Sequence, residues 1–410
     1  MADQDRDAFI ARMAQTKVSR RGFLAAAGLI GGSAALAACT GSSGATVAPT
    51  SSEPSTAPEP STEASAAESA APTAAPSYAI EDELWMLNWS GYVDPGNMET
   101  FKAEYGVKNF QYDIFANNDE LLAKLVGGAT GYDFSCPTAD YIPAMIEGGY
   151  IQKLDYSRIP NFKYIDPSIL SQPWDPNNEY HVPKDFGTTG ILYRAKDVKE
   201  PVTSWREFYD LSVGKYSGKV ILVDSLSDVL PFPLIMLGYS ANSVDPKELD
   251  EAKKILLDLA PHVLALDSDT YQDKLASEEA VLCLGWTGPL LLMRQQDPKL
   301  ADLTYVVPSE GAPFWLDTWV MMADAPHPNA TYAWFDYVQR PDIQAKETEY
   351  TGYATPNTEA KKLLPPKILN DPWIFPRADV MPKLQGTKPN VNSDEGRIAV
   401  WTEFKASIGG

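Results

Sequence analysis

The stretch EGAPFWLDTWVMM, residues 310–322, places an aromatic pair and a carboxylate just before a run with high β propensity. Alternate side chains of an extended chain share a face, so Trp315 and Asp317 are expected on the same side of a strand. The face of an indole attracts positive charge, and a carboxylate accepts hydrogen bonds from an ammonium group. The stretch therefore predicts part of a site for an organic cation. The alternative is a buried tryptophan beside a solvated aspartate.

From Leu84 onward, short apolar stretches alternate with helical patterns. Strands are expected at residues 84–88, 107–114, 132–136, 220–223 and 281–285. Helices are expected after the Asp94-Pro95 pair and at residues 120–126, 140–147, 245–259, 330–338, 342–350 and 398–406. This β-α-β-α alternation predicts an α/β layer fold with a mostly parallel sheet.

Composition narrows the class of function. The chain has 410 residues, which is enough for two domains, and a net charge of -21. Such an acidic surface disfavours nucleic acid and anionic ligands and tolerates cations. The three histidines lie at no metal-ligand spacing, and the sequence has no Cys-x-x-Cys pair and no Gly-x-Ser-x-Gly nucleophile motif. We therefore expect no metal site, no cofactor and no enzymatic activity.

The N-terminal region has the pattern of an export signal followed by a tether. An arginine pair, Arg20-Arg21, precedes an uncharged run from Gly22 to Ala38, which ends in the sequence LAAC at Cys39. This order resembles a twin-arginine lipoprotein signal, so residues 1–38 are expected to be removed and Cys39 to carry lipid. The alternative is an uncleaved N-terminal helix with a chance cysteine. Residues 39–78 are rich in Ser, Ala, Pro and Glu and are expected to form a disordered tether.

Aromatic or acidic residues follow nearly every expected strand. Open α/β sheets bind ligands at the carboxyl ends of their strands, so these side chains are expected to meet. They are Trp89, Tyr92, Thr138, Asp140, Asp224, Asp228, Trp286, Trp315 and Asp317. Their shared position predicts a cleft that binds a cation.

From about Leu84 to near its C-terminus, the chain resembles the spermidine/putrescine-binding proteins of polyamine ABC importers. Six motifs carry the resemblance: NWSGYV at 88–93, GYIQKLD at 149–155, WDPNN at 174–178, LGYS at 237–240, FWLD at 314–317 and GYATPN at 352–357. The resemblance implies a two-lobed periplasmic-binding-protein fold (type II), with a ligand cleft between lobes joined by a hinge. Lobe 1 would comprise residues 79–188 and about 318–356, and lobe 2 residues 189–317 and about 357–410.

The resemblance also implies roles for single residues. Five positions match the family's aromatic box: Trp89, Tyr92, Trp286, Trp315 and Tyr353. Asp317 matches a carboxylate that takes a ligand ammonium, Asp228 stands where the family has Glu, and Thr138 stands where it has Ser.

The chain departs from the family pattern at three positions. Ser225 replaces an Asp, Asp140 replaces a Tyr, and Gln385 is only a candidate for the family's C-terminal glutamine. The lost and gained carboxylates are expected to change the spacing of the charges that the cleft recognises.

The function implied is capture of a di- or polyamine such as putrescine or spermidine, outside the cytoplasm, for delivery to a cognate ABC permease. The protein is expected to be a monomer, held by its lipid at the outer face of the cytoplasmic membrane. The alternative is binding of another solute, such as 4-aminobutyrate, agmatine or another basic compound, or an iron chelate. Cys136 and Cys283 are expected to be small core side chains, and the resemblance places them in different lobes.

Overall fold

The computed structural model describes residues 78–408, except for the side chains of Gln295 and Gln296. The predicted signal peptide, Cys39 and the tether up to residue 77 lie outside the described residues. The described part falls within one compact unit, Ala74–Gly410. Within residues 78–408, no helix is both long and apolar enough to cross a membrane.

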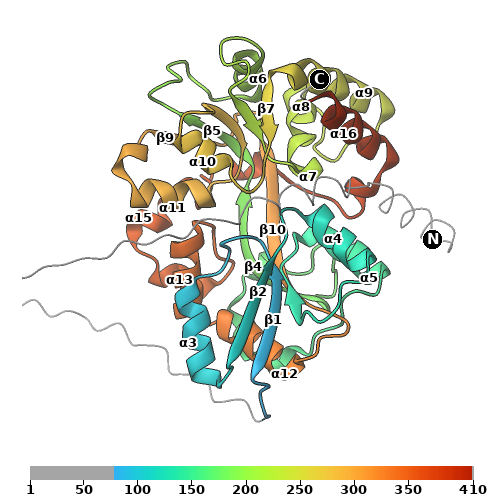
Figure 1. Ribbon diagram of the computed structural model, residues 1–410, viewed down its shortest axis with the longest axis vertical. Helices are drawn as coiled ribbons and strands as arrows, with labels where there is room; N and C mark the ends of the chain where they lie inside the picture. The colour runs from blue at the N-terminus through green and yellow to red at the C-terminus, as the bar shows by residue number, and fades with distance from the viewer. Residues whose placement is uncertain (1–77, 409–410) are drawn as a thin grey trace, which may run out of the picture. The chain divides into compact units, whose positions relative to one another are not determined.

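One sheet is built around the N-terminal strands of this unit (Figure 1). Its strand order is β11-β10-β3-β1-β2, and β4 also pairs with β10. The strands are β1 (Glu83–Asn88), β2 (Asn109–Ile114), β3 (Phe134–Ser135), β4 (His181–Thr188), β10 (Ala312–Met321) and β11 (Leu384–Gly386). Helices α3 (Pro95–Tyr105) and α12 (Pro328–Val338) pack together against it, around a core that includes Phe134, Trp319 and Trp334.

The second sheet has the order β7-β6-β8-β5-β9. Its strands are β5 (Gly190–Arg194), β6 (Val220–Leu222), β7 (Val263–Leu266), β8 (Leu282–Gly285) and β9 (Leu303–Val306). Its core is packed with helices α6 (Trp205–Val213), α8 (Pro231–Met236), α9 (Pro246–Leu259) and α16 (Glu395–Ser407). The two-lobed α/β architecture expected from the sequence is thus confirmed, with one sheet and one hydrophobic core to each lobe.

Both sheets are mixed, so the prediction of a mostly parallel sheet is wrong. In the first sheet β1 runs parallel to β2 and β3, but β10 runs antiparallel to β3 and β4. In the second, β6 runs parallel to β7 and β8, but β5 runs antiparallel to β8 and β9. The antiparallel strands are those through which the chain passes from one sheet to the other, and nothing in local sequence marks that passage.

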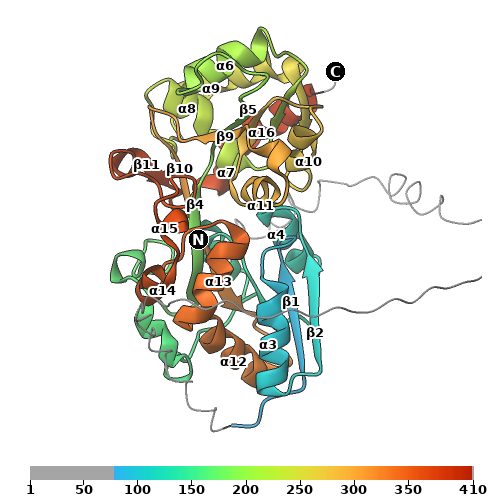
Figure 2. The ribbon, with the colours of Figure 1, turned by 90° about the vertical axis from the view of Figure 1, so that its left-hand side faces the viewer.

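Strands β4 and β10 connect the two lobes (Figures 1 and 2). β4 ends at Thr188 and β5 begins at Gly190, so one nearly continuous segment leads from the first sheet into the second. Likewise, Ala312 at the start of β10 belongs to the second core, whereas Trp319 near its end belongs to the first. The opening stretch is therefore a strand from Ala312 onward, despite its proline at position 313, and it runs past the boundary between the lobes.

The helix starts predicted from capping residues are confirmed. The Asp94 side chain accepts a hydrogen bond from the backbone N–H of Gly96 at the start of α3, and Asp245 caps α9 in the same way. Asn117 caps α4 (Asn118–Val126) through the N–H of Glu120. Each cap satisfies N–H groups that a first helical turn leaves free, which explains why these boundaries can be read from sequence.

The remaining helices complete the two lobes. They are α5 (Ile142–Glu147), α7 (Leu226–Val229), α10 (Tyr271–Ala276), α11 (Gly288–Gln296), α13 (Pro341–Thr351), α14 (Thr358–Leu363) and α15 (Pro366–Leu369). α11 contacts α13, and α14 packs on α13 as well (Figure 2). The exact division of the chain into lobes stays a proposal. Cys136 and Cys283 are buried in the first and second cores respectively, as expected, and both are free thiols.

Candidate functional site

A cavity of about 360 Å³ lies between the two sheets, lined by residues of both lobes. It brings together ten of the twelve side chains that the sequence singled out: Trp89, Tyr92, Thr138, Asp140, Ser225, Asp228, Trp286, Trp315, Asp317 and Tyr353. Asp224, which was expected to join them, lies outside the lining and pairs with Lys405 at 2.6 Å. Gln385 is not among the lining residues; its side chain accepts a hydrogen bond of 2.8 Å from the backbone N–H of Ala241. The carboxyl ends of β1, β3, β6 and β8 all lead into this cavity, as expected for an α/β sheet.

Two tryptophans from different lobes meet across the cavity. Trp89 follows β1, and its indole N–H donates a 2.8 Å hydrogen bond to the backbone carbonyl of Cys136. Trp286 follows β8, and its ring lies 6.1 Å from the ring of Trp89 in an edge-to-face arrangement. Because the indole of Trp89 is held by a backbone group, its ring can act as a fixed wall.

A second aromatic wall is set by β10. The ring centres of Trp315 and Tyr353 are 4.9 Å apart and nearly perpendicular. Across the ladder, Trp315 pairs with Gly187 of β4, and a Cβ at position 187 would stand 2.4 Å from the Trp315 ring. The absence of a side chain at Gly187 therefore makes room for the indole. The Trp315 indole N–H has no hydrogen-bond partner among the described residues.

Asp317 is a buried carboxylate whose hydrogen bonding is incomplete. It is 5% exposed, and its Oδ1 atom has no hydrogen-bond partner among the described residues. Its Oδ2 atom lies 2.6 Å from the hydroxyl oxygen of Tyr92, which lies equally close to Oδ1 of Asp185. Burial, followed by the negative charge of Asp185, raises the pKa of Asp317 to about 7. A cation placed at Oδ1 would remove the cost of leaving this carboxylate unpaired.

Lys184 and Asp185 form a buried ion pair beneath the cavity, which the sequence analysis missed. The Lys184 amine pairs with Oδ2 of Asp185 and lies 3.7 Å from the centre of the Tyr92 ring. Asp185 is the cross-strand neighbour of Asp317. A charged pair inside the run HVPKDFGT was a usable signal of a buried polar network, but the register that places it beside Asp317 is not visible in sequence.

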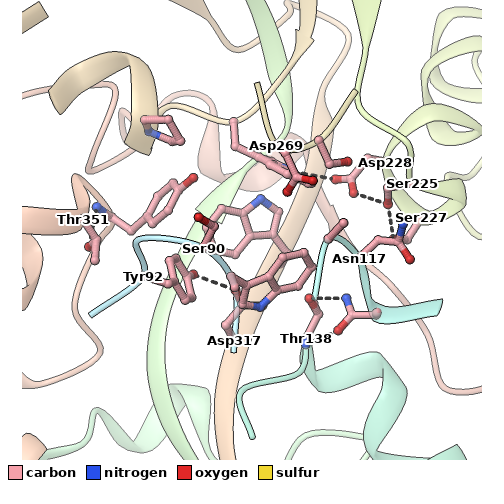
Figure 3. Close-up of a pocket in the computed structure, with 18 of the residues that line it drawn as sticks. Ser90, Tyr92, Asn117, Thr138, Ser225, Ser227, Asp228, Asp269, Asp317 and Thr351 are labelled. Atoms are coloured by element: carbon pink, nitrogen blue, oxygen red, sulfur yellow. Dashed lines mark hydrogen bonds between the residues drawn. The ribbon is translucent and has the colours of Figure 1, made fainter. Parts of the chain in front are cut away.

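Asp228 forms a second carboxylate site in the short helix α7, which follows β6 (Figure 3). It is 7% exposed and accepts hydrogen bonds from Thr189, from Ser225 and, at 3.2 Å, from the indole N–H of Trp286. Burial raises its pKa, and these three donors act in the opposite direction. The hydroxyl of Ser225 thus supports Asp228.

Asp140 lies just after β3, in the short turn Ala139–Tyr141. Its Oδ2 atom accepts a 3.0 Å hydrogen bond from the side chain of Asn392, in the segment before α16 of the other lobe. Its Oδ1 atom is buried without a partner among the described residues. Burial, with Asp228 as a further cause, raises the pKa of Asp140 to about 7. Nearby, the hydroxyl of Thr138 accepts a hydrogen bond from Asn118 and is fixed by it.

The cavity also holds polar residues that the sequence analysis did not select. They are Asn117, Asn118, Asp119, Ser227, Ser268, Asp269, Gln272 and Asp273. Asp269 follows the short strand β7. Because that strand was not predicted, Asp269 was not recognised as a residue that follows a strand. Figure 3 shows Asp228 and Asp269 on one side of the cavity, Asp317 and Thr138 on the other, and aromatic rings between them. The arrangement suits an elongated ligand with cationic groups separated by apolar segments.

Comparison with known proteins gives consistent results. Residues 96–376 match the model of a family described as bacterial extracellular solute-binding protein. The spermidine/putrescine-binding periplasmic protein of Salmonella typhimurium is 36% identical over 74% of this chain and 85% of its own.

Two solved structures resemble this fold over almost their whole length. The first, from Listeria monocytogenes, is described as a spermidine/putrescine ABC transporter. It has a TM-score of 0.72 and is 28% identical, and the match covers 79% of this chain and 99% of that one. The second is a spermidine/putrescine ABC transporter substrate-binding protein of Streptococcus pneumoniae. It has a TM-score of 0.67 at 30% identity, with the same coverage.

Proposed function

This chain belongs to the bacterial extracellular solute-binding proteins, in the family of spermidine/putrescine-binding proteins, and we propose that its cleft captures a protonated di- or polyamine for an ABC importer. Proteins of this kind bind a solute outside the cytoplasm and catalyse no reaction. Family membership supports the class of ligand, and the side chains of the cleft support the way in which that ligand is held.

The observation that carries the proposal is the unpaired Oδ1 of Asp317 beside Trp315. A buried carboxylate oxygen without a donor is costly unless a ligand supplies one. An ammonium group brings up to three N–H donors and a positive charge. The methylene chain attached to it gains by packing on an aromatic face, and Trp315 offers such a face on the same strand.

The other carboxylates offer further positions for ammonium groups along the same ligand. Asp228 keeps some acceptor capacity after its three protein donors, because two carboxylate oxygens provide about four lone-pair sites. The buried Oδ1 atom of Asp140 has no hydrogen-bond partner among the described residues, so a ligand N–H that reached it would complete its hydrogen bonding. Trp286 and Trp89 lie between the lobes, where the methylenes would pass.

The charge of the cavity disfavours ligands that carry a carboxylate, such as 4-aminobutyrate. Among the described residues that line the cavity there is no Lys and no Arg. Arg194 pairs with Asp302, and Arg294 stacks on Trp373, both outside the lining. A ligand carboxylate would therefore meet carboxylates without a balancing cation.

Export and anchoring form a separate part of the proposal. The protein acts outside the cytoplasm, and we infer from the motif at Arg20-Arg21 and Cys39 that it leaves by the twin-arginine route and is held by lipid. That it acts as a monomer is inferred from its family alone. Cells expressing Cys39→Ser are expected to lose labelling by a lipid precursor and to release the protein from the membrane fraction. Retained labelling in that variant would exclude Cys39 as the lipidated residue.

A thermal-shift panel tests the ligand class directly. The purified protein is heated with putrescine, spermidine, spermine, agmatine, 4-aminobutyrate, arginine or a ferric chelate. A ligand that binds only the folded state raises Tm in proportion to the logarithm of its concentration once it is in excess. We expect this from at least one di- or polyamine and not from 4-aminobutyrate. Stabilisation by 4-aminobutyrate or the chelate alone would reject the polyamine assignment.

A further inference from the structure

The hydroxyl of Tyr92 lies between two carboxyl groups and touches both. Its oxygen is 2.6 Å from Oδ2 of Asp317 and 2.6 Å from Oδ1 of Asp185. All three side chains are buried, with exposed fractions of 8%, 5% and 4% for Tyr92, Asp317 and Asp185. Water therefore has little access to screen charges within this trio.

A phenol has one proton, so it can donate a hydrogen bond to only one of the two carboxyl groups. If both carboxyl groups were ionised, the one that does not receive the phenol proton would face the phenol oxygen with no hydrogen between them. Two oxygen lone pairs would then repel each other at hydrogen-bond distance. Both contacts are favourable only when one carboxyl is protonated and donates to the phenol oxygen. The trio is therefore expected to hold two protons when the cleft is empty.

The neighbours of the trio decide which carboxyl carries the extra proton. Five titratable or charged groups face Asp317. They are Lys184 and Asp185 on β4, Tyr92 after β1, Cys136 after β3 and Tyr353 after α13. Glu347 of α13 faces Lys184. Lys184 is paired with the remaining oxygen of Asp185, so that carboxyl group already has a cationic partner. Asp317 has no cation bonded to it, and its raised pKa of about 7 agrees with the assignment.

We propose that Asp185, acting through Tyr92, holds a proton on Asp317 in the empty cleft, and that the ligand's ammonium displaces this proton. Asp185 is a positioning residue in this scheme, and the inference rests on the proposed capture of an amine. For each ammonium group that binds at Asp317, one proton is released to solvent. With the bound ammonium counted, the net charge of the trio and its lysine is zero, as it is in the empty cleft.

The proposal fixes how many protons leave at each pH. A carboxyl with a pKa of about 7 holds about 0.9 proton at pH 6 and about 0.1 proton at pH 8. The two terminal ammonium groups of putrescine, with pKa values near that of lysine at about 10.4, stay protonated in this interval, so putrescine gives the proton count without a contribution from the ligand. Asp317 should therefore release close to one proton on binding at pH 6 and almost none at pH 8, and this group alone should make the affinity about tenfold weaker at pH 6.

Isothermal titration calorimetry measures this number. The purified protein is titrated with putrescine and with spermidine at pH 6 and at pH 8, in buffers that differ in ionisation enthalpy. The slope of the binding heat against that enthalpy gives the protons released. Absence of binding in every buffer would reject the proposed function itself. Normal binding with no proton release at pH 6 would reject this inference and leave the function intact.

Variants identify the source of the proton. Asp185→Asn removes the charge that favours protonation of Asp317, so proton release at pH 6 should fall severalfold and the pH dependence of affinity should flatten. The matched control is Asp113→Asn, which disrupts a surface pair with the hydroxyl of Tyr132 and should leave proton release unchanged.

Asp140 is another lining carboxyl whose pKa is raised to about 7, and it needs its own test. Proton release that persists in Asp140→Asn supports the trio as the source. Release that is lost in Asp140→Asn but kept in Asp185→Asn would overturn the proposal. If Asp185→Asn fails to fold because Lys184 loses its partner, the wild-type and Asp140→Asn titrations still decide the question.

Discussion

The indole of Trp315 occupies the space that a side chain at Gly187 would need. The two residues are partners across the β4–β10 ladder, and a Cβ on Gly187 would stand 2.4 Å from Cζ2 of Trp315. A carbon at that distance from a ring atom forces one of the two to move. The position of the aromatic wall is therefore set by a glycine on the neighbouring strand.

Gly187→Ala should displace Trp315 and weaken ligand binding. A well-packed aromatic anchor contributes about 2 kcal/mol or more to binding, which corresponds to about thirtyfold in affinity. Titration calorimetry with the best ligand measures the change. Gly386→Ala on β11 is the control, because its nearest neighbour, Phe314, is 4.0 Å from the added carbon. Equal affinity in both variants would mean that Trp315 is not a wall of the site.

Asp317→Asn should remove most of the affinity for an amine. Truncating or neutralising one partner of a buried charge pair costs on the order of 2–5 kcal/mol, so binding should weaken by roughly thirtyfold or more. The amide keeps the shape of the carboxyl, which separates the loss of charge from a loss of packing. A change of less than about threefold in calorimetry would contradict the role of Asp317.

Asp140→Asn should weaken binding of a polyamine, because the free Oδ1 of Asp140 is available to one of its ammonium groups. We expect a loss on the order of tenfold, as for a charge-assisted hydrogen bond. Asn392→Ala is the comparison: it removes the residue that holds Oδ2 from the other lobe and leaves the charge in place, so its effect should be smaller. Unchanged affinity in Asp140→Asn would show that this departure from the family does not touch the ligand.

The unliganded protein should be more stable at pH 5 than at pH 8. Burial raises the pKa values of Asp140, Asp317 and Glu347 to about 7, whereas unfolded carboxyls titrate near pH 4. Between these values the folded state holds more protons than the unfolded state, so the free energy of unfolding falls as pH rises from about 4 to about 7.

Melting curves between pH 5 and pH 8 test this pH dependence. Tm should decrease as pH rises from 5 to 8. A saturating amine should make this decrease smaller, because it pairs with the carboxylates of the cleft. Glu347 lies outside the cavity lining, so Glu347→Gln should reduce the fall both with and without ligand. A Tm that rises from pH 5 to pH 8 without ligand would contradict these protonation states.

The sequence predicted the parts of the site that follow strands with a clear apolar pattern. Trp89, Thr138, Asp228 and Trp286 could be placed because they follow β1, β3, β6 and β8, short strands of the two sheets whose carboxyl ends face the same cavity. The helix starts at Asp94 and Asp245 could also be predicted, because an N-terminal cap depends only on residues next to it in the chain.

Features that depend on pairing between distant segments could not be predicted in this way. The contact of Asp185 with Tyr92 requires the register of β4 against β10, which is set over more than a hundred residues of chain. The bond from Asn392 to Asp140 depends on how the two lobes meet. β4 itself was missed, because it is buried along its whole length and its charged pair breaks the apolar pattern.

A crystal structure of the protein with putrescine or spermidine bound tests the central claim most directly. We expect an amine nitrogen within hydrogen-bond distance of Oδ1 of Asp317, with the methylenes along the Trp315 ring and a further nitrogen near Asp228 or Asp140. A ligand that leaves Oδ1 of Asp317 unpaired, or an amine bound outside this cavity, would contradict the account.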